Sequence, residues 1–111
     1  MILCIPSVGP DSGDSIDDRF GRAPYFIIYD TETDTITPHR NESAGGMGGV
    51  GLKAAQFLIN HGVDAVIAGR VGGNALEALK AGGIKVFLYQ GKGTVKEAIS
   101  GFLHGSLKEQ E

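Results

Sequence analysis

The chain has 111 residues, a length typical of one domain, and 41% of them are hydrophobic, which is enough to build a core. The formal net charge is −3, and no basic run is present, so we expect no nucleic-acid partner. No apolar run is long enough to span a membrane and no signal peptide is recognisable, so no membrane partner is expected. The single cysteine, Cys4, excludes a disulfide framework and favours a cytoplasmic location.

The first half of the chain predicts three strands. Met1–Pro6 is a short continuous apolar run, typical of a buried central strand. Tyr25–Asp30 is rich in β-branched and aromatic residues, and Thr35–His39 alternates more weakly. The turn between these two segments, Thr31–Asp34, is short enough for an antiparallel hairpin, and Pro38 favours an edge position for the third strand.

The second half alternates helices and strands. Apolar residues at helical spacing predict a helix that begins near Leu52, and further helices are expected after Asn74 and Thr94. Val63–Ala68 and Ile84–Tyr89 read as strands between them. Such alternation favours parallel strands joined by right-handed crossovers.

Together these elements give the order β-β-β-α-β-α-β-α, which predicts an α/β fold with a mixed five-stranded sheet covered by helices. We expect one domain over residues 1–111, with residues 104–111 as a polar tail that frays. The first helix should bury the face that carries Leu52, Ala55 and Leu58.

Ser43–Gly51 is the most unusual stretch, because five of its nine residues are glycine and it leads directly into a predicted helix. Glycine lets a ligand approach the backbone closely, and a helix N-terminus offers free N–H groups and a positive dipole end. The stretch therefore predicts a cradle for an anion, in which the backbone of Gly45, Gly46, Gly48 and Gly49 takes part. The alternative is a flexible, solvated linker.

Ligands of α/β sheets bind beyond the carboxyl ends of the parallel strands. Four loops should meet there: the loop after Pro6, Ser43–Gly51, Gly69–Gly73 and Gln90–Gly93. Three of these loops are rich in glycine, so we expect the binding site at this edge of the sheet, with Gly72 among its residues.

The segment Arg19–Asp30, read R-F-G-R-A-P-Y-F-I-I-Y-D, carries a family resemblance together with the glycine-rich stretch. Further matching segments are Val66–Gly69, Asn74–Val86 and Gly93–Val95, so the resemblance covers nearly the whole chain. The chain resembles the dinitrogenase iron–molybdenum cofactor biosynthesis family, in its small stand-alone form.

This resemblance implies a ribonuclease H-like fold and a non-enzymatic protein, related to nitrogen fixation, that binds a metal–sulfur cluster or its precursor. One stand-alone relative holds a molybdenum–copper sulfide cluster without covalent attachment. A carrier of this kind would also meet a cluster donor or acceptor protein. Where carriers of the family often have His before the Phe–Gly pair, this chain has Arg19, and where many stand-alone members have His in the glycine loop, it has Met47.

Three residues are candidate metal ligands. Cys4 is a soft ligand if it faces the site, or a small core residue if it faces inward. Met47 lies in the glycine loop, where it suits either a thioether ligand or a mobile lid. His39 is the only histidine near that loop in the sequence.

Three arginines are candidate anion ligands, since the planar guanidinium fork suits anions. Arg70 follows a predicted strand directly, in a glycine turn. Arg19 and Arg22 flank Phe20-Gly21, and a salt bridge to a nearby aspartate is the alternative role for both. The candidate partners in such a salt bridge are Asp17, Asp18 and Asp30. Separately, the acidic cluster of Asp11, Asp14, Asp17 and Asp18 either holds a hard metal ion or forms a solvated acidic loop; its spacing matches no EF-hand.

Two rival functions stand beside the cluster carrier. Gly46–Gly51 formally satisfies G-x-G-x-x-G, so a nucleotide-binding domain is one rival, but the fingerprint should follow the first buried strand. The other rival is a protein-interaction or regulatory module without a cofactor. No catalytic set of side chains is apparent, and we expect no enzymatic activity.

Overall fold

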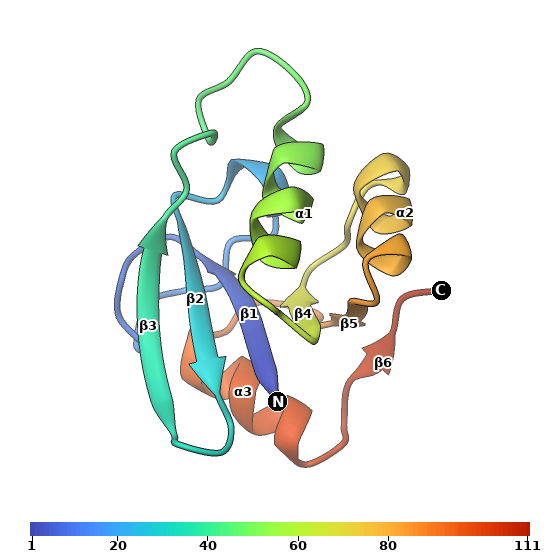
Figure 1. The fold of residues 1–111 in the computed structure, drawn as a ribbon. Helices are drawn as coiled ribbons and strands as arrows, with labels where there is room; N and C mark the ends of the chain where they lie inside the picture. The colour runs from blue at the N-terminus through green and yellow to red at the C-terminus, as the bar shows by residue number, and fades with distance from the viewer.

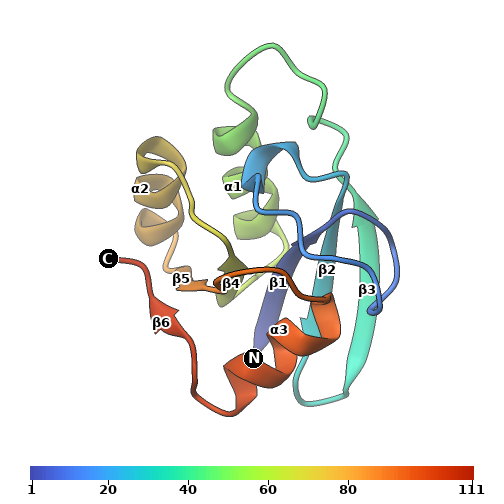
Figure 2. The ribbon, with the colours of Figure 1, turned by 180° about the vertical axis from the view of Figure 1, so that it is seen from behind.

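The computed structural model describes residues 1–111 and shows a three-layer α/β arrangement (Figure 1). A mixed sheet separates helices α1 and α2 on one face from helix α3 on the other (Figure 2). The strands are β1 (Ile2–Ser7), β2 (Tyr25–Asp30), β3 (Thr35–Arg40), β4 (Ala65–Ala68), β5 (Lys85–Leu88) and β6 (Lys108–Glu109). The helices are the 3₁₀ turn η1 (Phe20–Arg22), α1 (Val50–Asn60), α2 (Gly73–Ala81) and α3 (Val95–Leu103).

The strand order in the sheet is β3-β2-β1-β4-β5-β6. Strands β1, β2 and β3 form an antiparallel meander, and β4 and β5 extend the sheet from β1 in parallel. The predicted α/β class, the hairpin and the parallel second half are thereby confirmed. The edge position of β3 agrees with Pro38. The finer ribonuclease H-like assignment stays a prediction.

The sheet has six strands, so the expectation of five strands was wrong. The sixth strand, β6, pairs antiparallel with β5 through Phe87 with Glu109 and Leu88 with Lys108. Lys108 and Glu109 are polar, and two residues are too few to produce a strand pattern. The sequence therefore gives no sign of β6.

The polar tail after residue 104 does not fray. The Gln110 side chain is buried and forms two hydrogen bonds with the backbone of Val71: the Val71 N–H donates to Oε1 at 3.0 Å, and Nε2 donates to the Val71 carbonyl at 2.8 Å. A third bond runs from the Gln110 N–H to the Val86 carbonyl. The tail is therefore fixed beside the turn between β4 and α2.

The two faces of the sheet have separate cores, which follow from side-chain alternation along the strands. In β1, Cys4 points to the face covered by α1 and α2, whereas Leu3 and Ile5 point to the face covered by α3. Cys4 is completely buried, and burial raises the pKa of its thiol far above the ordinary value.

Helix α1 buries a slightly different face from the one predicted. Ala54, Ala55 and Leu58 face the sheet, while Leu52 is 49% exposed. Leu52 lies in the first turn of α1, and its side chain is outside the core that the rest of the helix covers. None of the helices is long and apolar enough to cross a membrane.

We predict that Gln110→Ala lowers the free energy of unfolding by about 2 kcal/mol or more, because it leaves a buried donor and a buried acceptor of Val71 without partners. Chemical denaturation measures the change. The exposed neighbour Glu109 supplies the control, and Glu109→Ala should stay within about 0.5 kcal/mol of the parent. Equal stability of the two variants would show that the tail is not docked.

Candidate functional site

An open crevice of about 490 Å³ lies between η1 and the first turns of α1 and α2. The three candidate arginines, Arg19, Arg22 and Arg70, all line it. The rest of its wall is mainly glycine and backbone. The crevice therefore joins three of the four loops predicted to converge: the Ser43–Gly51 stretch, the Gly69–Gly73 turn and, through Asp18, the loop after Pro6.

Helix α1 begins at this crevice without a capping side chain. Its N-cap is Gly49, which has a φ of 68° and therefore a left-handed backbone that favours glycine. The first bond of the helix runs from the Lys53 N–H to the Gly49 carbonyl at 3.0 Å. The three preceding N–H groups, of Val50, Gly51 and Leu52, have no acceptor in the protein.

Helix α2 begins at the same crevice in the same way. Its N-cap is Gly72, again without a capping side chain, and its first bond runs from the Leu76 N–H to the Gly72 carbonyl at 2.8 Å. The N–H groups of Gly73, Asn74 and Ala75 are therefore free. Two helix N-termini thus direct free donors and positive dipole ends toward one space.

Helix α3, which faces the other side of the sheet, is capped fully. Thr94 and Glu97 form a capping box: the Glu97 N–H donates to the Thr94 hydroxyl at 3.1 Å, and the Thr94 N–H donates to the Glu97 carboxylate at 3.0 Å. The chain therefore caps the helix outside the crevice and leaves the two helices at the crevice open to a ligand.

Close backbone packing brings the two open helix ends together. A Cβ on Gly51 would lie 3.3 Å from the Ala75 Cβ, so the first turns of α1 and α2 are in contact. A Cβ on Gly21 would lie 2.7 Å from the Gly51 nitrogen, closer than real Cβ atoms come. Only glycine at position 21 lets η1 close the third side of the crevice.

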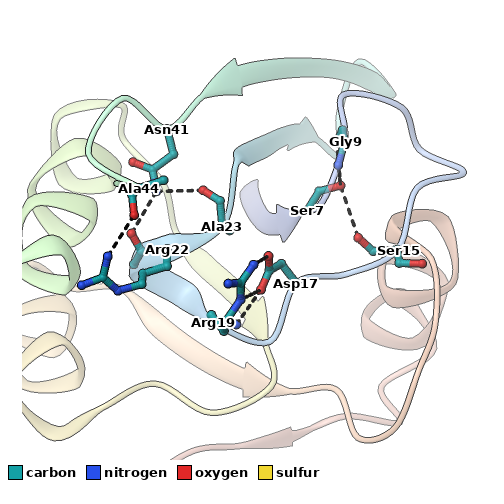
Figure 3. Close-up of polar contacts among 10 residues, drawn as sticks. Ser7, Gly9, Ser15, Asp17, Arg19, Arg22, Ala23, Asn41 and Ala44 are labelled. Atoms are coloured by element: carbon teal, nitrogen blue, oxygen red, sulfur yellow. Dashed lines mark hydrogen bonds and ion pairs between the residues drawn. The ribbon is translucent and has the colours of Figure 1, made fainter. Parts of the chain in front are cut away.

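Arg19 lines the crevice but is also paired with Asp17. Its Nη2 and Nε donate to the two carboxylate oxygens at 2.7 and 3.0 Å (Figure 3). The Asp17 side chain is 3% exposed and that of Arg19 is 63% exposed. The buried carboxylate therefore holds the exposed guanidinium group in place. The hydrogen bond from the Arg19 side chain holds the pKa of Asp17 below its ordinary value.

The expectation of a solvated acidic loop was therefore wrong for Asp17. Its carboxylate also accepts the Arg19 N–H at 2.9 Å, so it acts as an anchor of the turn before η1. No group of three or more His, Cys, Asp or Glu side chains is placed to hold a metal ion, which removes the acidic loop as a hard-metal site.

Neither Arg22 nor Arg70 forms a salt bridge with a carboxylate. The Arg22 Nη1 donates to the carbonyls of Ala44 and Gly46 at 3.1 and 2.9 Å, which ties the glycine-rich loop to η1. Arg70 is exposed and forms neither a hydrogen bond nor an ion pair. Asp18, on the same wall, is the one carboxylate of the crevice.

Asn41 is a structural residue of the site that the sequence did not reveal. Its Nδ2 donates to the carbonyl of Ala23 at 2.9 Å (Figure 3) and to that of Gly21 at 3.0 Å. Its Oδ1 accepts the Ser43 N–H at 3.2 Å. A single asparagine before a loop is a common turn residue, so its spacing carries no signal of this role.

The structure brings together part of the predicted set. Arg19, Arg22, Gly48, Gly49, Arg70 and Gly72 line the crevice. Gly45 and Gly46 do not; they lie in the loop above it, where the Gly46 carbonyl accepts from Arg22. The glycine run follows the edge strand β3 and not the first strand, so the dinucleotide fingerprint lacks its structural context.

The three predicted metal ligands do not converge. Cys4 is buried in the core, so it cannot reach a ligand in the crevice. Met47 is fully exposed on the glycine-rich loop, outside the lining of the crevice. His39 packs against α1, where its ring lies 5.5 Å from that of Phe57. Burial, and then the charge of His61, lower the pKa of His39.

Comparison with known proteins gives a consistent set of relatives. The sequence model of the family described as dinitrogenase iron-molybdenum cofactor matches residues 1–105. An uncharacterized protein of Methanocaldococcus jannaschii is 33% identical over 106 residues, which cover 92% of this chain and 88% of that protein.

Two solved structures agree closely with this fold. The apo form of the orange protein from Desulfovibrio gigas has a TM-score of 0.93 at 34% identity, over 98% of this chain and 92% of that one. The NMR structure of a NifB-like protein from Thermotoga has a TM-score of 0.84 at 46% identity, over 97% and 91% of the two chains.

The pairing of Asp17 with Arg19 predicts a pH-dependent contribution to stability. Because the pKa of Asp17 is below its ordinary value of 3.8 in the folded state, the contribution is present above that value and is lost as the pH falls through the folded pKa. Asp17→Asn should cost about 1–2 kcal/mol at pH 7 and progressively less in acid.

Denaturant unfolding at a series of pH values tests this expectation. Asp18→Asn is the matched control, since the exposed neighbouring carboxylate forms no hydrogen bond. A cost for Asp17→Asn that does not change with pH would show that the ion pair has no stabilising role.

Proposed function

The chain belongs to the dinitrogenase iron–molybdenum cofactor family, and on that premise we propose that it carries or stores an anionic metal–sulfur cluster in the crevice. The protein would act in the cytoplasm and without catalysing a reaction. The observation that carries the proposal is the convergence of two uncapped helix N-termini beside the unpaired Arg70. Each helix end is equivalent to about half a positive charge, so the two together add about one.

The residues of the crevice fit an anion that arrives already assembled. No cysteine or histidine lies in the lining, and the free backbone N–H groups are donors suited to the outer atoms of a cluster. Sulfide atoms of metal clusters accept such hydrogen bonds, which also tune cluster properties. A cluster held through its outer shell can leave again without breaking a metal–protein bond, as a carrier requires.

Both cluster types expected from the sequence suit this arrangement. An iron–molybdenum precursor and a molybdenum–copper sulfide cluster share a negatively charged sulfide surface, and the crevice is open enough to expose one side of the bound cluster to a donor or acceptor protein.

Reconstitution under anaerobic conditions tests the proposal. The purified protein is titrated with tetrathiomolybdate and copper(I), and separately with iron and sulfide, while visible absorbance and bound metal are measured. We expect one coloured complex per chain, and Arg70→Ala should weaken it about tenfold or more, because it removes a charge-assisted hydrogen bond. Arg40→Ala, outside the crevice, is the control and should bind as the parent does.

No coloured complex from either mixture would contradict cluster binding. Tight binding of a nucleotide in the same crevice would favour the nucleotide-binding rival, and capture of one partner by the colourless protein would favour the interaction module.

Gly73→Ala separates binding from folding. A Cβ at this position meets no protein atom within 4 Å, and helical Cβ atoms tilt toward the N-terminus, which here is the crevice. We expect the variant to be more stable by about 0.4–1 kcal/mol, because alanine restricts the unfolded chain, and to bind the cluster more weakly.

Thermal unfolding and the same titration give both values. Gly13→Ala adds a methyl group to open space outside the crevice and should leave binding unchanged. Unchanged cluster affinity in Gly73→Ala would show that the ligand does not approach the start of α2.

A further inference from the structure

A pair of histidines at the carboxyl end of α1 lies outside the crevice. His39 comes from β3 and His61 is the residue that ends α1; their ring centroids are 5.1 Å apart. Phe57, one turn earlier in α1, stacks on His61 at 4.0 Å and contacts His39 at 5.5 Å. Since α1 has 11 residues, this group lies about 16 Å along the helix from the crevice.

The nitrogen atoms of the pair are available to a ligand. The His61 Nδ1 lies 2.8 Å from the Phe57 carbonyl, which can only accept, so Nδ1 carries the proton of the neutral ring and Nε2 keeps its lone pair. The hydrogen bonds of histidine side chains in the protein involve His61 and His104, and none involves a ring nitrogen of His39. His61 is exposed and His39 half-buried, so solvent ions have access.

The spacing matches two ligands of one metal ion. Zinc binds imidazole nitrogen at about 2.0–2.1 Å, so a ring centroid lies about 3.2 Å from the ion and two tetrahedral ligands have centroids about 5.2 Å apart. The observed centroid separation is 5.1 Å, close to this value, with the two ring planes inclined at 70°. The bond from His61 Nδ1 to a carbonyl is also the outer contact that orients a metal-bound histidine.

We propose that His39 and His61 form a second, surface site for a divalent transition-metal ion such as Zn²⁺ or Ni²⁺, with water in the remaining positions. Imidazole suits these ions, and Phe57 fixes both rings through aromatic packing. The site is independent of the crevice and does not rest on cluster binding.

The third histidine supplies a matched control. His104 ends α3 as His61 ends α1, and its Nδ1 lies 2.7 Å from the Ser100 carbonyl four residues earlier. It has the same local geometry as His61 but forms no pair with a second histidine ring. A difference in metal binding between the two histidines therefore comes from the side chains that surround His61, which are the rings of His39 and Phe57.

The experiment is a calorimetric titration of untagged apo protein with ZnCl₂, repeated with NiCl₂. The variants are His39→Phe and His61→Phe, which keep an aromatic ring beside Phe57, together with His104→Phe. We expect one ion per chain, and each of the first two variants should weaken binding about tenfold or more. Even the loss of a residue that only supports a metal ligand lowers metal affinity by about that factor. His104→Phe should bind as the parent does.

Thermal unfolding with and without Zn²⁺ gives a second measure, because a ligand that binds the folded state raises its stability. Loss of the Zn²⁺-dependent shift in the first two variants alone would agree with the proposal. Unchanged affinity in His39→Phe, an equal loss in His104→Phe, or no binding by the parent would each overturn it.

Discussion

The contact between the first turns of α1 and α2 is the constraint on which the site depends. It requires glycine at position 21, where a Cβ would lie 2.7 Å from the backbone of α1, and it is tight at Gly51, where a Cβ would lie 3.3 Å from that of Ala75. Because the helix ends meet in an open crevice, their unpaired N–H groups remain hydrated, and the cost of a buried unsatisfied donor is avoided. The same six groups are then ready to exchange water for an anion.

Three buried polar side chains hold the walls of this crevice from segments far apart in the chain. Asn41 joins η1 to the start of the glycine-rich loop, Asp17 fixes Arg19, and Gln110 fixes the turn that carries Arg70. The backbone donors are therefore placed by regular structure and buried hydrogen bonds, while the cationic groups of Arg70 and Arg19 remain at the surface. Such a division gives a fixed backbone cradle with one fixed arginine, Arg19, and one unpaired arginine, Arg70, beside it.

Local patterns made much of the fold predictable, and long-range contacts account for what was missed. The strand Tyr25–Asp30 was predicted with its observed bounds because its apolar residues are continuous and flanked by turns. Arg70 and the glycines of the crevice followed from their place at strand and helix ends, whereas Arg19 and Arg22 followed from the segment around Phe20-Gly21 that carries the family resemblance. The missed features were the sixth strand and the buried side chains of Asn41 and Gln110. All of them consist of polar residues whose partners lie 18 to 39 positions away in the chain, which no local pattern can show. The sequence left open which way Cys4 faces, and proximity in sequence wrongly favoured His39 as a ligand, because the faces of β1 and β3 follow from packing with α1.

The most direct test of the anion cradle is ¹H–¹⁵N NMR of the apo protein during titration with tetrathiomolybdate, a compact sulfide anion. If the open helix ends bind it, the amide signals of Val50–Leu52 and Gly73–Ala75 shift together and saturate, whereas those at the start of the capped helix α3 do not. Saturating shifts elsewhere in the chain, with these six amides unchanged, would contradict the cradle.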